Sequence, residues 1–264
     1  MNFDIKRAFV MASRNFLQLK RDPAKLLHVF YWSFLDIVIW GYSASWIQKD
    51  STSSIIGISL LAAVVFWQFI VRSNLDLCLG ILEEVVSHNI TNLFASPLNL
   101  SEWIIGLLLV SSFISIILLF FCYLIVLFIY KISLFAIFGW SLFLFLGLLF
   151  MAGTSFGFLS GAIIIKGGSR YQGLVFMMGW IFAPLGGIFY PISVLPFWVQ
   201  AIASRFPLMY IFDAMRNFIK SGLIDWYLII NALFLNLLYL LIFITIFYLT
   251  FKNSKKNGLS RLIE

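Results

Sequence analysis

Three charged residues lie inside long apolar stretches, where a charge is costly unless it is paired or has a functional use. Asp36 interrupts the first apolar stretch, and Arg72 and Asp76 lie four residues apart in the second. Residues at i and i+4 share a face of a helix, so Arg72 and Asp76 can form an ion pair. Charges within apolar helices are candidates for ion relays or transport pathways. For Arg72 and Asp76 the sequence favours a structural ion pair, whereas Asp36 is the better pathway candidate, although no partner is evident.

The composition explains why these charges stand out. The 264 residues are 62% hydrophobic and only 11% charged, and the mean hydropathy is +1.01. A single soluble core cannot bury this much apolar surface, so the sequence predicts an integral membrane protein. The sequence pI of about 9.5 comes from basic residues at the ends of apolar stretches, as membrane topology requires. We therefore expect membrane lipid, and no nucleic acid, as a partner.

Residues for common enzyme chemistry are not grouped in this sequence. There is no HExxH pair, and the one G-x-S-x-G match, Gly153 to Gly157, lies inside an apolar helical stretch and not on the strand-to-helix turn that a serine nucleophile requires. His28 and His88 are far apart, and neither is followed by a second ligand three or four residues further along the chain. Cys78 and Cys122 lie in separate apolar stretches, as is typical of buried free cysteines. An intramembrane enzyme is therefore the least favoured class, and we expect neither a catalytic residue nor a metal site.

Apolar stretches of membrane-spanning length predict an all-α fold that forms one domain over residues 1–264. A bilayer core about 30 Å thick requires about 20 helical residues. In the fourth stretch, Gly153, Gly157 and Gly161 recur every four residues, a spacing that lets another helix approach closely, either within the chain or at a subunit interface. The six predicted spans cover residues 27–47, 55–81, 103–130, 133–165, 171–189 and 226–251.

The segment before the first span, residues 1–23, predicts an amphipathic helix that lies on the membrane surface. Its apolar residues recur at spacings of three and four, and its other side is mostly basic. With both termini in the cytoplasm, the charges follow the positive-inside rule for a plasma-membrane protein. The basic residues expected inside are Lys6, Arg7, Arg14, Lys20, Arg21, Lys25, Lys166, Arg170, Lys252, Lys255, Lys256 and Arg261. Those expected outside are Lys49, Lys131, Arg205, Arg216 and Lys220.

Residues 190–220 are apolar enough for a membrane, but they predict a re-entrant hairpin and not a seventh span. A complete crossing would move the basic C-terminal tail to the outside. We expect a bend near Ser204 and Arg205, with the broken backbone packed inside the bundle. On the second arm, Arg216 follows Asp213 by three residues and can pair with it. A continuous span is prevented by three prolines, which are Pro191, Pro196 and Pro207.

Residues 82–100, between the second and third spans, predict a short cytoplasmic helix that ends near Ser96 and Pro97. This segment could simply connect two spans, or its apolar side could bind a soluble partner. The apolar side consists of Val85, Val86, Ile90, Leu93 and Phe94. The polar side consists of Glu83, Glu84, His88, Asn89 and Asn92.

Three segments resemble the type-2 ABC exporter permeases, which move polysaccharides, lipids and drugs. They are LKRDP at the end of the first helix, EEVVSHNITNLFASPLNLSEW before the third span, and FYPISVLPFWVQAIASRFPLMYIFDAMR before the last. The resemblance covers essentially the whole chain and is closer to the drug, lipid and nodulation-factor branch. Its most specific piece is the last, through the order and approximate spacing of Pro191, Pro196, Pro207, Asp213 and Arg216.

The resemblance implies two sites and an assembly of two permeases with two ATPase subunits. The sequence has no G-x-x-x-x-G-K-[ST] phosphate loop, so ATP and Mg are expected on the partner and no cofactor on this chain. A coupling helix would contact the ATPase through Glu83, Glu84, His88, Asn89, Asn92, Phe94 and Pro97. A re-entrant outer gate would contain Tyr190, Pro191, Pro196, Trp198, Arg205, Pro207, Asp213 and Arg216.

Two function classes follow from these residues. The favoured one is the permease of an ATP-driven exporter that carries an amphipathic or glycan-type substrate between two subunits, along the first, second and fifth spans. The alternative is a secondary transporter or channel driven by an ion gradient. The pathway candidates are Asp36, Trp40, Trp67, Arg72, Asp76 and Trp180. For each tryptophan, anchoring at the lipid interface is the more common use.

Overall fold

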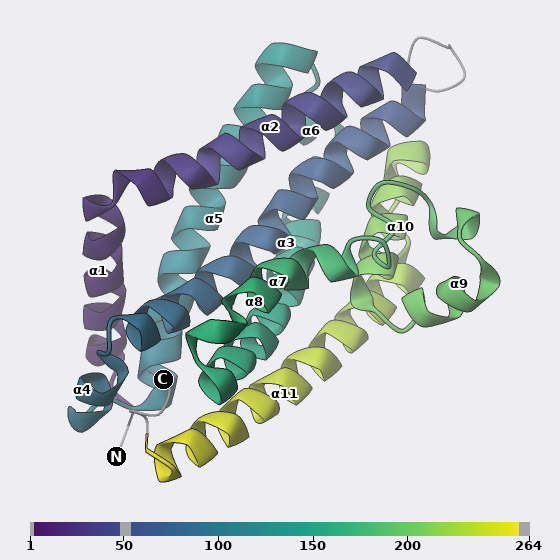
Figure 1. The fold of residues 1–264 in the computed structure, drawn as a ribbon. Coiled ribbons are helices and arrows are strands. Elements are labelled where there is room, and N and C mark those ends of the chain that lie inside the picture. The colour runs from purple at the N-terminus through teal and green to yellow at the C-terminus, as the bar shows by residue number, and fades with distance from the viewer. Residues whose placement is uncertain (1–2, 48–53, 259–264) are drawn as a thin grey trace.

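The computed structural model describes residues 3–47 and 54–258, and within these ranges it contains helices and no strands (Figure 1). The prediction of an all-α fold class is therefore confirmed. Lys49 and Arg261, which entered the charge comparison, lie outside the described residues.

Four helices in the described residues are long and apolar enough to cross a membrane: α3 (Ser54–Val86), α5 (Leu100–Tyr130), α7 (Ser141–Gly167) and α11 (Trp226–Lys256). The first predicted span forms α2 (Pro23–Ile47), whose 25 residues extend over about 37 Å, but it contains no stretch as apolar as those in these four helices. Figure 1 shows α2 running alongside α3.

Two of the predicted spans differ from the helices observed. Residues 133–165 divide into α6 (Leu134–Phe138) and α7, because Gly139 adopts φ +52°, a conformation that favours glycine. Residues 171–189 contain a 3-10 turn, η2 (Ser169–Tyr171), and α8 (Gln172–Phe182), followed by turns. The 11 residues of α8 extend over only about 16 Å and cannot cross a bilayer core alone.

The first helix, α1 (Ile5–Arg21), begins where the Asp4 carboxylate accepts a hydrogen bond from the Lys6 backbone N–H at 2.9 Å. It ends before Pro23, with Lys20 and Arg21 at the negative end of the helix dipole. Its buried side, formed by Ala8, Met11 and Leu19, packs along α5.

Helix α3 lies at the centre of the bundle and packs against α2, α5 and α7. The glycines of α7 make its contact with α3 close. A β-carbon at Gly153 would lie 2.7 Å from the Ile70 carbonyl oxygen, one at Gly157 3.1 Å from Leu77, and one at Gly161 2.6 Å from Ile81. The small-residue ridge thus packs within the chain. Helix α11 also packs against α7.

Apart from η2 and α8, the short helices lie at two opposite ends of the bundle (Figure 1). The start of α1, α4 (Ile90–Ala95) and the end of α11 lie at one end. At the other end lie α6, the 3-10 turn η3 (Ile192–Val194), α9 (Phe197–Ala203) and α10 (Pro207–Ser221). The helix is interrupted between α9 and α10 at residues 204–206, where the sequence predicted a bend.

We predict that Gly153→Ala destabilises the bundle by about 1–3 kcal/mol, because the added methyl group would overlap α3 backbone that cannot move freely. The measurement is the melting temperature of the purified protein in nanodiscs. Gly147→Ala is the matched control, since Gly147 lies on the same helix and a β-carbon there meets no atom within 4 Å. Equal melting temperatures for the two variants would contradict close α3–α7 packing at Gly153.

Candidate functional site

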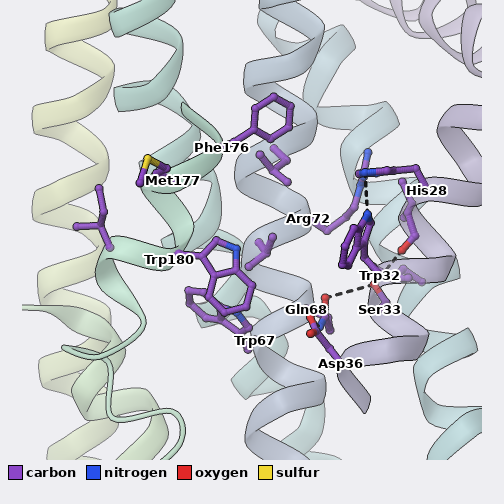
Figure 2. Close-up of a pocket in the computed structure, with 15 residues that line it drawn as sticks. His28, Trp32, Ser33, Asp36, Trp67, Gln68, Arg72, Phe176, Met177 and Trp180 are labelled. Carbon is purple, nitrogen blue, oxygen red and sulfur yellow. Dashed lines mark hydrogen bonds between the residues drawn. The ribbon is translucent and has the colours of Figure 1, made fainter. Parts of the chain in front are cut away.

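A large cavity, with a volume of about 820 Å³, lies between α2, α3 and α8 (Figure 2). These helices contain the first, second and fifth predicted spans. Of the predicted pathway residues, the cavity is lined by Asp36, Trp67, Arg72 and Trp180. Trp40 instead stacks on Phe189, with ring centroids 4.5 Å apart.

A chain of hydrogen bonds forms the polar wall of the cavity, drawn in Figure 2. Ser33 donates from Oγ to Gln68 Oε1 at 3.2 Å, and Gln68 donates from Nε2 to Asp36 Oδ2 at 2.7 Å. An ionised carboxylate can only accept hydrogen bonds, so the amide of Gln68 presents its N–H group to Asp36. Gln68 is therefore the partner of Asp36 that sequence reasoning did not find.

Histidine and tryptophan side chains form the aromatic walls. Trp32 donates from Nε1 to His28 Nε2 at 2.8 Å, so this imidazole nitrogen acts as an acceptor. Trp67 and Trp180 meet edge to face, with ring centroids 6.0 Å apart (Figure 2). Trp67 is only 1% exposed, while Trp180 is 49% exposed. The α8 side of the cavity therefore opens to the outside of this chain.

The predicted ion pair between Arg72 and Asp76 is present, and both side chains are buried. Arg72 lines the large cavity and also a second cavity of about 40 Å³, which Asp76 lines together with Lys25 and Glu83. The pair thus lies between the two cavities. Its charges are neutralised within one helix, as the i,i+4 spacing predicted.

The acidic residues of the predicted coupling segment bind basic residues of their own chain. Glu84 is 2% exposed and forms an ion pair with Arg14 of α1 at 2.7 Å. Asn89 also donates to Glu84, from Nδ2 to Oε2 at 2.7 Å. Glu83 pairs with Lys25 of α2 at 2.5 Å. Both glutamates belong to the last turns of α3 and not to a separate helix.

Most of the apolar side of the same segment packs against this chain, and Val86 is its one largely exposed member, at 54%. This corrects the expectation that the whole apolar side is free for a soluble partner. Val85 and Ile90 are buried. The Phe94 ring contacts Trp103 and Phe251, with centroids at 5.4 and 4.7 Å. The side that stays exposed around α4 consists of His88, Thr91, Asn92, Ala95, Ser96 and Pro97.

Glu102, a residue that sequence reasoning missed, ties the start of α1 to the connection between α4 and α5. It is fully buried and accepts the backbone N–H groups of Asp4 and Asn99, each at 2.8 Å. Arg7 lies 3.7 Å from Glu102 and donates to the Pro97 carbonyl at 2.5 Å. The Asn-x-x-Glu spacing is a capping-box signal that could have revealed the local part of this site.

In the predicted gate, Arg216 holds the turn that follows α8. It pairs with Asp213 at 3.2 Å, as predicted, and donates to the carbonyls of Gly187 and Tyr190. Gly187 adopts φ +63°, and a β-carbon there would lie 3.0 Å from Arg216 Nη2. Arg216 therefore satisfies backbone carbonyls that no helix pairs, which is required where water is scarce.

The remaining predicted gate residues differ in burial. Pro207 is buried at the first position of α10, where proline does not interrupt helical hydrogen bonding. On the side of η3 and α9, Trp198 is 68% exposed. Pro191, Pro196 and Arg205 are also exposed. Helix α10 thus packs inside the bundle against α11 and α7, whereas α9 lies outside it in a single chain.

A family model described as ABC-2 type transporter matches residues 6–220, from α1 to α10. The chain belongs to the ABC-2 type transporter family. The match includes the cavity, α4 and the hairpin, and it identifies a multi-pass membrane permease of the ABC transporters. Members of this family are generally not enzymes themselves and typically work with an ABC ATPase. No curated protein matches the chain significantly.

For this ABC-2 type permease, we predict that Arg216→Ala loosens the turn between α8 and α9, because the Gly187 and Tyr190 carbonyls lose their donor. Amide hydrogen exchange in residues 186–195 should rise about tenfold or more. Lys220→Ala, at an exposed site on the same helix, is the control and should leave this exchange unchanged. Wild-type exchange rates in Arg216→Ala would contradict the anchoring role.

Proposed function

We propose that this protein is the membrane-spanning permease subunit of an ATP-driven exporter. It would move an amphipathic or glycan-type substrate out of the cytoplasm or the inner leaflet. The observation that carries the proposal is the combination of the family match with a large cavity between α2, α3 and α8. This cavity joins aromatic side chains to a short polar wall, which suits a substrate with both apolar and polar parts.

The proposed topology has six crossings in the plasma membrane and both termini in the cytoplasm. Besides α3, α5, α7 and α11, helix α2 would cross once, and the interrupted passage through α8 would supply the fifth crossing. The position of α1, α4 and the end of α11 at one end of the bundle supports this assignment (Figure 1). That end would be cytoplasmic, and the end with α9 and α10 would be the outer gate.

Energy would come from an ABC ATPase that docks at the end with α4, with ATP and Mg bound by that partner. The exposed side of α4, including Asn92, would make the contact. Two internal connections support a rigid transmission from this end: the Arg14–Glu84 pair joins α1 to α3, and Glu102 joins the start of α1 to α5. Motion of α4 would therefore move three helices together.

Export would proceed by alternating access in a dimer of permeases with two ATPase subunits. ATP binding would have to favour one arrangement over the other, since a ligand with equal affinity for both shifts neither. The cavity side that opens at the half-exposed Trp180 supports a pathway shared with a second permease.

Transport is predicted to require the ATPase. The permease in nanodiscs should hydrolyse ATP no faster than empty nanodiscs, and hydrolysis and export should appear when its ATPase is added. A catalytically inactive ATPase variant that still binds is the control. Transport driven by an ion gradient without any ATPase would contradict the proposal and favour the secondary-transporter alternative.

The exposed side of α4 is predicted to be the docking surface. Asn92→Arg should reduce ATPase capture in pull-downs by about tenfold or more, because a buried interface position does not tolerate an unpaired charge. Asn217→Arg makes the same change at an exposed position at the opposite end and should have no effect on capture. Equal capture by both variants, at equal amounts in the membrane, would place docking elsewhere.

A further inference from the structure

The large cavity contains a carboxylate without a cationic partner. Among the ion pairs of the described residues, none includes Asp36, and its hydrogen bond from Gln68 comes from a neutral amide. Arg72 also lines the cavity, but it is paired with Asp76. A carboxylate in apolar surroundings is costly unless a positive charge compensates it. The cavity is therefore complementary to a cation brought by a ligand.

The polar groups around Asp36 offer little to a neutral, hydroxyl-rich ligand. The single hydroxyl proton of Ser33 is shared between the Val29 carbonyl, at 3.0 Å, and Gln68 Oε1, at 3.2 Å. The Trp32 N–H is taken by His28. A glycan needs many free hydrogen-bonding groups, and few remain here. An anionic amphiphile would be repelled by the Asp36 carboxylate. It would also find no free guanidinium, because the Arg72 side chain in the cavity wall is already paired with Asp76.

The other walls suit a cation with a bulky apolar body. Three tryptophans line the cavity, and the indole face is the best aromatic partner for a cation. Figure 2 shows Trp67 and Trp180 side by side, with Trp32 on the side of Asp36. Most of the remaining lining is apolar, including Val71, Leu118 and Ile181.

We infer that this cavity binds a lipophilic organic cation, such as a quaternary ammonium or phosphonium carrying large apolar groups. The cationic centre pairs with Asp36, held in place by Gln68, and the apolar groups lie against Trp32, Trp67 and Trp180. This inference rests on the proposed export function in one respect, since it takes the cavity to be the substrate pathway. Binding itself requires neither ATP nor the ATPase.

The test uses the purified full-length permease in nanodiscs of zwitterionic lipid, with binding of radiolabelled tetraphenylphosphonium measured by equilibrium dialysis. Empty nanodiscs give the lipid background. Tetraphenylborate, which has nearly the same shape and the opposite charge, is the matched ligand. We expect saturable, protein-dependent binding of tetraphenylphosphonium and none of tetraphenylborate.

The variants separate charge from shape. Asp36→Asn keeps the size of the side chain and should weaken tetraphenylphosphonium binding about tenfold or more. Asp36→Glu keeps the charge and should retain most of the affinity. Asp22→Asn removes a carboxylate that is exposed and outside this cavity, and it should bind like the wild type. Trp180→Leu, at a half-exposed position, should weaken binding several-fold, and it tests the aromatic wall if Asp36→Asn fails to assemble.

Three results would overturn the inference: no saturable binding above empty nanodiscs, equal binding by wild type and Asp36→Asn, or equal protein-dependent binding of tetraphenylborate. These results are distinct from failure of the proposed function. Export that depends on an ATPase, without cation binding, would leave the exporter intact and remove only the ligand class. Cation binding without any coupling to an ATPase would support the ligand class and remove the proposed exporter function.

Discussion

The scarcity of water inside a bilayer governs this structure, because polar groups at membrane depth must find partners within the protein. After α8 the helix is interrupted, and the carbonyls of this turn have no partner within a helix. Arg216 of α10 donates hydrogen bonds to two of them. Arg72 and Asp76 neutralise each other on α3. Asp36 is different, because its hydrogen bond comes from an amide and leaves its charge uncompensated.

Helix α3 connects the features on which transport would depend. Its middle carries Trp67, Gln68 and Arg72 in the cavity wall, and its last turns carry Glu84, which binds α1. The glycines of α7 hold α7 against α3 at backbone distance. A close-packed contact of this kind moves as a unit and does not deform continuously. A displacement of α3 at the end with α4 would therefore also displace the part of α3 that forms the cavity wall.

Class, helical content and short-range pairs could be predicted from the sequence. The membrane class follows from apolar content alone, since no soluble core could bury it. The Arg72–Asp76 and Asp213–Arg216 pairs follow from helical spacing, because both partners lie on one helix. Proline positions predicted that no single helix runs through residues 190–220, where η3, α9 and α10 are separate elements. The interruptions at Gly139 and after Phe182 were missed, because apolar composition continues through residues whose backbone leaves the helix.

The tertiary structure alone decided which helix faces which, and with it the partners that lie far apart in the sequence. Gln68 meets Asp36, Arg14 meets Glu84, and Arg216 meets Gly187 across separations that no periodicity encodes. The segment around α4 is a further example, since its amphipathic pattern identified an apolar side but not the residues that pack against it. Trp103 and Phe251 of the same chain fill that position. An amphipathic pattern fixes which side of a helix is buried, whereas the surface that buries it depends on the packing of the whole bundle.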